Sequence, residues 1–499
     1  MLEIIVFLPI LAALAIGLGA PARFTALGAA VITLILSLVA AIQFESNVEG
    51  MFQMGSDRPL LVMDGFPTLS LSFGVDGISL VLLLLSTLVL VAAVLVSPQE
   101  SDIKGSSKLY YSSLLLIGGG AIGAFLSTDL FFLYAFHELA LIPTFLMIGI
   151  FGKGEDRVKT AWTITIYLGV GSLILLVGLI MAVVSLGGTT FQIAELIAIA
   201  EDPESGIAAG DQTWIYLLLL IGFGILVSLF PFHSWAAPAY SQAPTPVAML
   251  HAGVLKKFGL YGLIRIALPI LPAGAESLAN VVLILLLGNI IYLGLVTIAQ
   301  KSLDRMLGYS SVMHMGYVFL GIVAANSIGV SGAVLLMFAH GVSIALLFAL
   351  CGWMRDHFGT VKFEELGGIA SKLPKLGLLF GFAAFAAAGL PGFANFAAEV
   401  AVFFGAFSGM GDQLGWIQWT TIIALWGVVI SAVYMLRAYR NLFMGPVAPK
   451  MEIPTDLSWS TRLPLLLLLA ALVAVGFVPE LLNQFIRPGV DGLLPAVAG

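Results

Sequence analysis

Long apolar segments constrain the fold of this chain more than any other feature of its sequence. A helix needs about 20 mostly apolar residues to cross a bilayer, and fourteen segments meet that requirement. They cover residues 3–19, 24–43, 75–97, 108–127, 129–151, 160–186, 213–231, 244–270, 276–299, 305–323, 329–352, 375–409, 416–440 and 462–483. With 60% hydrophobic and 10% charged residues, the chain also lacks the polar surface of a soluble domain. We therefore expect an all-α polytopic membrane protein, in which residues 1–499 form a single membrane domain.

The positions of the positive charges predict how these segments are oriented. Of the 21 Lys and Arg residues, sixteen lie in loops that follow odd-numbered segments. These are Arg23, Lys104, Lys108, Lys153, Arg157, Lys159, Lys301, Arg305, Arg355, Lys362, Lys372, Lys375, Arg437, Arg440, Lys450 and Arg462. Because short loops rich in Lys and Arg stay in the cytoplasm, both termini are expected on the non-cytoplasmic side of a bacterial inner (cytoplasmic) membrane. The first segment is interpreted as a retained helix, since no basic stretch precedes it.

Two of the fourteen segments carry residues that break a helix. Segment seven ends at Pro231 with Pro238 close behind, and segment twelve contains GLPGFANF, with Gly389 and Pro391 near its middle. Because segments five apart run in opposite directions, segments four to eight and nine to thirteen are expected to form two inverted five-helix repeats. Each repeat then has one discontinuous helix, as in transporters. The predicted divisions are residues 1–107 for helices one to three, 108–270 and 276–440 for the repeats, and 462–483 for helix fourteen.

Ionisable side chains inside the apolar segments are few, and they predict a path for protons or other ions. Glu138 lies in LYAFHELALIPTF, Lys256 and Lys257 in AGVLKKFGLYG, and Glu399 in NFAAEVAVFFGAF. An unpaired charge in the middle of the bilayer costs about 3 kcal/mol or more. Each of these residues is therefore a candidate for a titrating role, with a purely structural ion pair as the alternative.

Histidines within the segments give a weaker signal. Neutral imidazole can pass protons along a chain of water molecules, but a single histidine in a membrane helix is as often a packing residue with satisfied hydrogen bonds. His233 and His340 are retained as candidates. His137, His251 and His314 are considered weaker ones.

Motifs for cofactor chemistry are absent from the sequence. Cys351 is the one cysteine, which excludes a CxxC pair or an iron–sulfur ligand set, and the histidine spacing matches no metal signature. The glycine-rich runs lie within helices rather than after strands, so no nucleotide site is expected. We expect no cofactor in this chain and no nucleic-acid partner; the lipid bilayer is its surroundings.

Several stretches of this sequence resemble one family of membrane proteins. They are FGVDGISLVLLLLSTLV, FHELALIPTFLMIG, FHSWAAPAYSQAPTPVAMLHAGVLKKFGLYGLIR, YSSVMHMGYVFLGI, FAHGVSIALLFALCG and GLPGFANFAAE. Together they resemble the antiporter-like membrane subunits of respiratory complex I over nearly the whole length. Within that family the M type (mitochondrial subunit 4) is the most similar, ahead of the L and N types.

The resemblance implies roles for particular residues. It implies a fourteen-helix fold in which a glutamate on helix five pairs with a lysine on helix seven. A lysine on helix eight lies on a central polar axis, and a glutamate or lysine on helix twelve leads to the exit side. Glu138 matches the first of these, Lys257 the helix-eight lysine and Glu399 the helix-twelve residue.

One position departs from the family pattern. Leu226 stands where the resemblance places the helix-seven lysine, so Glu138 lacks the cation that the family pattern implies. Lys256, which precedes Lys257, is a candidate substitute, because adjacent helical residues point about 100° apart. The alternative is that Lys256 faces an interface or the membrane surface.

These features together indicate a proton-translocating subunit of the membrane arm of an NADH:quinone oxidoreductase of the complex I type. Such a subunit carries no redox centre; the resemblance implies that NADH, FMN, iron–sulfur clusters and quinone are used by other subunits, and that the neighbouring membrane subunits are of the L, N and K types. Two alternatives share the fold: a subunit of a multisubunit cation/proton antiporter, and the membrane arm of an energy-converting hydrogenase.

Overall fold

A set of long apolar helices makes up most of the structure. The computed structural model describes residues 1–46, 50–63, 66–408, 410–411, 413–448 and 452–494. Within these residues, twelve helical stretches are long and apolar enough to cross a membrane. The shorter apolar helix α1 (Leu2–Leu18) and the broken pair α17 (Pro374–Ala387) and α18 (Ala394–Phe407) add two more crossings. The expected polytopic helical fold is therefore confirmed, and the crossings correspond to the fourteen predicted segments.

The helices follow the chain in an N-terminal set, two groups of five crossings and a C-terminal pair. The N-terminal set is α1, α2 (Ala22–Gln43) and α3 (Gly77–Val96). The first group is α4 (Ser107–Leu126), α5 (Leu130–Phe151), α6 (Arg157–Ser185), α8 (Ala209–Val227) with α9 (Ala236–Gln242), and a span of α10 (Thr245–Leu250), α11 (Lys257–Gly262) and α12 (Leu268–Ile270). The second group is α13 (Pro272–Leu287) with α14 (Leu293–Ile298), α15 (Leu303–Val323), α16 (Ser327–Phe358), α17 with α18, and α19 (Trp416–Ala424) with α20 (Trp426–Phe443). The C-terminal pair is α21 (Trp459–Phe477) and α22 (Glu480–Asp491).

The fourth crossing of each group is discontinuous. In the first group α8 ends where Ser228 adopts a left-handed conformation, with φ 66°, and Pro231 and Pro238 follow before α10. In the second group the chain leaves the helix between α17 and α18, where Gly389 and Gly392 have φ 70° and 95°. Both breaks coincide with the residues that predicted them.

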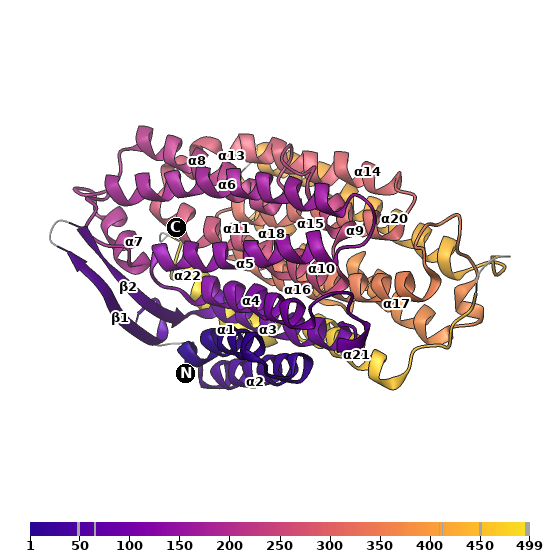
Figure 1. Cartoon of the computed structure of the whole chain (residues 1–499). Helices are drawn as coiled ribbons and strands as arrows, with labels where there is room; N and C mark the ends of the chain where they lie inside the picture. Colours follow the sequence, from indigo (N-terminus) through magenta and orange to yellow (C-terminus); the bar gives the residue numbers. More distant parts are fainter. Residues whose placement is uncertain (47–49, 64–65, 409, 412, 449–451, 495–499) are drawn as a thin grey trace.

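One end of the helix bundle carries the N-terminus, α22 and the strands (Figure 1). The strands β1 (Gln53–Met63) and β2 (Phe66–Val75) form an antiparallel hairpin there, near the short helix α7 (Ile193–Glu201). The hairpin lies between the second and third predicted segments, where no membrane helix was expected. The alternation of Leu69, Ser70, Leu71, Ser72 and Phe73 is the period-two signal of a strand, which a search for long apolar segments does not detect.

The opposite end of the bundle carries the loops that are rich in Lys and Arg. The α3–α4, α5–α6, α14–α15, α16–α17 and α20–α21 connections all lie at this end (Figure 1). Lys450, one of the sixteen predicted basic loop residues, lies outside the described residues. The loops that are rich in Lys and Arg therefore lie at one end of the bundle, and the loops that alternate with them along the sequence lie at the other.

The centre of the bundle is sealed from its surroundings by protein. Within the apolar windows of α16 and of the span Thr245–Ile270, every residue is buried, and most of α3 is buried as well. Lys256, Lys257 and Arg265 lie on that span and are at most 1% exposed. None of the three can extend to the membrane surface, so their charges must be balanced inside the protein.

A buried ion pair joins the end of this span to the N-terminal end of α3, which follows the β-hairpin. Arg265 pairs with Asp76, and Asp76 also accepts a hydrogen bond from the Ser79 backbone N–H as the N-cap of α3. The C-terminal helix α22 covers the pair: Pro479 follows the end of α21, and Gly489 of α22 lies against the Asp76 carboxylate. Arg265 was not predicted as a site residue, and in the structure Asp76 balances its charge.

We predict that Asp129 determines where α5 begins. Its buried carboxylate accepts hydrogen bonds from the backbone N–H groups of Phe131 and Phe132. Replacing it with alanine should destabilise the subunit by about 0.5–2 kcal/mol, because these N–H groups lose their cap. Thermal unfolding of the purified subunit in detergent measures the change. Asp129→Asn keeps an oxygen acceptor and is the control; equal destabilisation by both variants would contradict the capping role.

Candidate functional site

Lys257 is the first residue of α11, and Lys256 separates it from a π-helical turn over His251–Leu255. Its Nζ donates a hydrogen bond to the carbonyl of Ala252 at 2.7 Å and lies 3.0 Å from Nδ1 of His340 on α16. The side chain is fully buried. The predicted central lysine is therefore joined to a predicted histidine on another helix.

Two further contacts connect His340 to Glu399 through His314. The rings of His340 and His314, which lies on α15, have centroids 5.5 Å apart. Nε2 of His314 lies 4.0 Å from Oε1 of Glu399 on α18. Lys257, His340, His314 and Glu399 thus form a buried row, which we call the central row, across three helices and the π-interrupted span. Each of its members is at most 4% exposed.

The break between α17 and α18 shapes the Glu399 end of the central row. His314 Nε2 lies 3.1 Å from the carbonyl oxygen of Ala387, the last residue of α17, and its Nδ1 lies 2.8 Å from the carbonyl of Ser310. Both ring nitrogens therefore face oxygen acceptors, so an acceptor is in place for a second ring proton. A Cβ on Gly389 would come within 2.5 Å of Glu399 Oε2. The unwound segment supplies a carbonyl to the row and leaves room for its carboxylate.

Asn289 forms hydrogen bonds with backbone groups at the break after α8. This fully buried side chain accepts a hydrogen bond from the Phe230 backbone N–H at 2.7 Å and donates to the carbonyls of Ser228 and Val312. Trp235 donates from Nε1 to the carbonyl of Ile225 at 3.1 Å. Backbone groups freed by a broken helix inside a membrane need such partners. The search for ionisable residues could not find Asn289, because the amide carries no charge.

Lys256 does not take the place of the helix-seven lysine in the way the sequence suggested. Its Nζ lies 3.4 Å from Ser311 Oγ on α15 and 5.5 Å from the centre of the Tyr240 ring. Among the described residues, no salt bridge joins Lys256 to Glu138. Lys256 therefore contacts α15, the helix that also carries His314.

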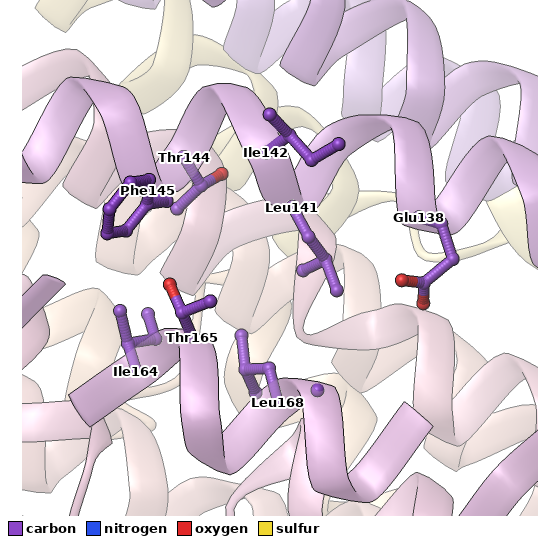
Figure 2. Close-up of a pocket in the computed structure, with 9 residues that line it drawn as sticks. Glu138, Leu141, Ile142, Thr144, Phe145, Ile164, Thr165 and Leu168 are labelled. Atoms are coloured by element: carbon purple, nitrogen blue, oxygen red, sulfur yellow. The ribbon is translucent and has the colours of Figure 1, made fainter. Parts of the chain in front are cut away.

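Glu138 lies in a cleft between α5 and α6, away from the central row (Figure 2). The cleft has a volume of about 170 Å³, and its walls are mostly apolar, including Leu141 and Leu168. The carboxylate accepts a hydrogen bond from Ser172 Oγ on α6 and lies 3.3 Å from Nδ1 of His137. With 36% of its side chain exposed, Glu138 faces the outside of this subunit.

The remaining candidate, His233, lies apart from these groups. It follows the break after α8, and its ring packs against Phe230 and Tyr292, with centroids 5.6 and 6.3 Å away. In the described part of the chain, none of its contacts reaches the central row. His314, which the sequence ranked below His233, lies in that row; no local pattern separates the two residues, because the distinction depends on which helix each one faces.

A polar cavity opens at the end of the bundle that carries the basic loops. It has a volume of about 830 Å³ and is lined by Lys104, Lys153, Arg157 and Asp356, with Thr245 at the start of α10. Lys153 pairs with Asp356, and burial lowers the pKa of the Lys153 ammonium from its ordinary value. The cavity reaches the first turn of the span that holds Lys256 and Lys257.

Metal binding has no support in the part of the chain that the structure describes, where no group of three or more His, Cys, Asp or Glu side chains could hold an ion. The site consists of proton-bearing nitrogens and oxygens on packed helices. Such groups exchange protons with one another and with water. The fold and the central row define a polytopic membrane protein of the transporter type.

Comparison with known proteins identifies the family. A family described as "NADH:quinone oxidoreductase/Mrp antiporter, TM" matches residues 127–429. NADH-quinone oxidoreductase subunit M of Rhodobacter capsulatus is 33% identical over 99% of this chain and 96% of that protein. The chain belongs to the NADH:quinone oxidoreductase/Mrp antiporter family.

Solved structures show the same fold. A chain of respiratory complex I from Thermus thermophilus with bound NADH superposes with a TM-score of 0.89 and 27% identity, covering 100% of both chains. A chain of the Mrp complex from Dietzia sp. DQ12-45-1b superposes with a TM-score of 0.84 and 20% identity, covering 99% of this chain and 97% of that one. The second similarity concerns the fold alone.

We predict that Gly389→Ala disturbs Glu399. The new methyl group would lie 2.5 Å from the Glu399 carboxylate, and φ 70° also disfavours alanine. Gly445→Ala is a matched control, because Gly445 has φ 82° with nothing within 4 Å of the added Cβ. Infrared difference spectroscopy of the carboxyl region should show a shifted Glu399 band only in the Gly389 variant, with Glu399→Gln identifying the band. An unchanged band in Gly389→Ala would contradict the contact.

Proposed function

We propose that this chain is a proton-translocating membrane-arm subunit of an NADH:quinone oxidoreductase of the complex I type. The observation that carries the proposal is the central row: a buried lysine, two histidines and a glutamate in contact, running from the π turn beside Lys257 to the break between α17 and α18. Similarity to subunit M of Rhodobacter capsulatus over nearly the whole length supports the complex I type.

In the proposed mechanism, protons enter the bundle through the polar cavity at its basic end. That cavity reaches Thr245 at the start of α10, six residues before the π turn that precedes the two lysines. Lys257 then passes a proton from Nζ to Nδ1 of His340, and the proton continues through His314 to Glu399. A charge on Lys256 repels one on Lys257 in a buried site, so the two lysines drive the proton along the row. His233 stays a prediction of the sequence, because no contact joins it to the row.

Glu138 has a separate role in this proposal. A partly exposed carboxylate at bilayer depth requires a partner outside the subunit or a protonated state. The cleft between α5 and α6 fits a neighbouring membrane subunit, and α6 presents an apolar surface there that includes Ile166 and Leu173, 60% and 63% exposed. We propose that membrane subunits of the L, N and K types are the neighbours of this chain.

The rest of the complex supplies the energy. The proposal places NADH, FMN, iron–sulfur clusters and quinone in other subunits, and gives this chain no redox centre. It places the chain in the inner membrane of a bacterium, with both termini on the non-cytoplasmic side. The separation of basic loops from the end with the N-terminus and α22 supports that orientation.

We predict that the central row is needed for proton pumping. Lys257→Ala and Glu399→Gln should each lower the initial rate of proton uptake into proteoliposomes, driven by NADH and quinone, by on the order of tenfold or more, since each removes a proton-carrying group. Glu138→Gln should lower it as well. Assembly of the complex is checked by native electrophoresis, and Glu364→Gln, in an exposed loop, is the control.

The outcome also distinguishes the alternative functions. Normal pumping in the assembled Lys257 and Glu399 variants would contradict the proposed path. Proton movement that requires sodium and persists without NADH and quinone would favour a cation/proton antiporter, the class of the Mrp complex with which the chain shares its fold.

The orientation can be tested with cysteine labelling, because the chain has one cysteine, Cys351, which is buried. Ser205, in the α7–α8 connection, and Ser101, in the α3–α4 connection, are both exposed. These two connections lie at opposite ends of the bundle (Figure 1). In intact spheroplasts, a membrane-impermeant maleimide should label Ser205→Cys and leave Ser101→Cys unlabelled until the membrane is permeabilised. Labelling of Ser101→Cys alone would reverse the proposed orientation.

A further inference from the structure

His137 is a buried titratable group that the proposed path does not use. It precedes Glu138 on α5, and its Nδ1 lies 3.3 Å from Glu138 Oε1. The side chain of His137 is 4% exposed, whereas that of Glu138 is 36% exposed. The histidine therefore lies on the inner side of the carboxylate, between the cleft and the centre of the bundle.

The ring of His137 is held on the face of α11 next to the lysines. It stacks on Phe258 with centroids 4.0 Å apart and an interplanar angle of 14°, and Phe258 directly follows Lys257. With Nδ1 directed to Glu138, Nε2 is the second place where the ring can carry a proton. Stacking fixes the plane of the ring, so its two nitrogens keep these different surroundings.

His251 provides the next group inward. Its ring centroid lies 5.6 Å from that of Tyr240, and the Lys256 Nζ lies 5.5 Å from the centre of the same Tyr240 ring. Both of its ring nitrogens are buried without a protein partner in the described chain, as is the hydroxyl of the neighbouring Tyr240. Buried polar atoms are normally hydrogen-bonded to protein or to ordered water. These atoms supply the several polar partners that a bridging water needs.

We propose that His137 relays protons between Glu138 and the buried lysines, by way of His251. In the inward step the Glu138 O–H bond breaks as an N–H bond forms at Nδ1, which makes the ring an imidazolium. The Nε2–H bond then breaks, and that proton passes through water to His251 and on to Lys256. The starting tautomer returns by proton exchange with water. This relay rests on the proposed function, because it delivers protons from Glu138 to the lysine that precedes the central row's Lys257.

A carboxyl group lies on one side of His137, and two basic groups lie on the other. Glu138 is on its own helix, and Ser172 and Tyr134 complete the hydrogen-bonded group around that carboxylate. His251 and Lys256 lie on the inner side. The Glu138 carboxylate stabilises the imidazolium, and the proton moves inward when Lys256 is neutral, because only a neutral amine can accept it.

The test compares three substitutions at position 137 in the assembled complex. His137→Gln keeps a hydrogen-bond donor for Glu138 but cannot relay a proton. His137→Phe keeps stacking on Phe258, and His137→Lys keeps a proton-carrying nitrogen. We expect the rate of NADH-driven proton uptake into proteoliposomes to fall at least about tenfold in the Gln and Phe variants and to be partly restored in the Lys variant.

A second histidine provides a matched control. The ring of His357 stacks on Trp353 at the same centroid distance of 4.0 Å, but it lies exposed at the end of α16. His357→Gln should pump at the wild-type rate. Gln and Phe variants of His137 that pump normally, or a Gln variant that pumps better than the Lys variant, would overturn the relay and leave a positioning role.

The double variant with Glu138→Gln separates failure of the relay from failure of the proposed function. If both residues act in one path, His137→Gln should add little to the loss caused by Glu138→Gln. A loss in Glu138→Gln with normal pumping in His137→Gln would overturn the relay alone. Normal pumping in both single variants would overturn the role of Glu138 as well, and the relay with it.

Discussion

Polar groups inside the hydrocarbon region need partners, and this requirement governs the structure at both broken helices. The break after α8 frees backbone groups that the Asn289 amide and the Trp235 indole satisfy. The break between α17 and α18 frees the carbonyl of Ala387, which contacts His314. The first break is therefore closed by neutral side chains, whereas the second is closed by a member of the central row. This difference makes the second break part of the site and the first mainly a structural joint.

The same need for hydrogen-bond partners applies to the buried lysines. The span that carries them is surrounded by protein along its whole apolar window, so an ammonium group there must find acceptors within the bundle. The π turn brings the Ala252 carbonyl to Lys257, and α16 brings His340. Among the described residues, Lys256 contacts Ser311 and the face of Tyr240. Lys256 therefore has fewer hydrogen-bond partners than Lys257, the next residue in the chain. In the proposed function, this difference favours the passage of a proton between the two side chains.

Glu138 illustrates how a subunit can be incomplete by itself. Its carboxylate is satisfied on one side by Ser172 and His137, while the other side opens to a cleft of mostly apolar residues. An exposed carboxylate at this depth makes sense where another protein covers it. In the proposed function, a neighbouring subunit covers this carboxylate at the surface of α5 and α6.

The sequence alone determined which segments cross the membrane, where two of them break, and that Lys257, Glu399 and Glu138 are buried or partly buried in those segments. These properties follow from local features: the length of an apolar run, proline and glycine, and a charge among leucines. The hairpin at β1 and β2 had a local signal too, in the alternation from Leu69 to Phe73. The tertiary structure decided the partners. It turned Lys256 toward Ser311 rather than Glu138, gave His314 a position in the row, and left His233 outside it, because the direction of a side chain depends on how its helix is rotated against the neighbours.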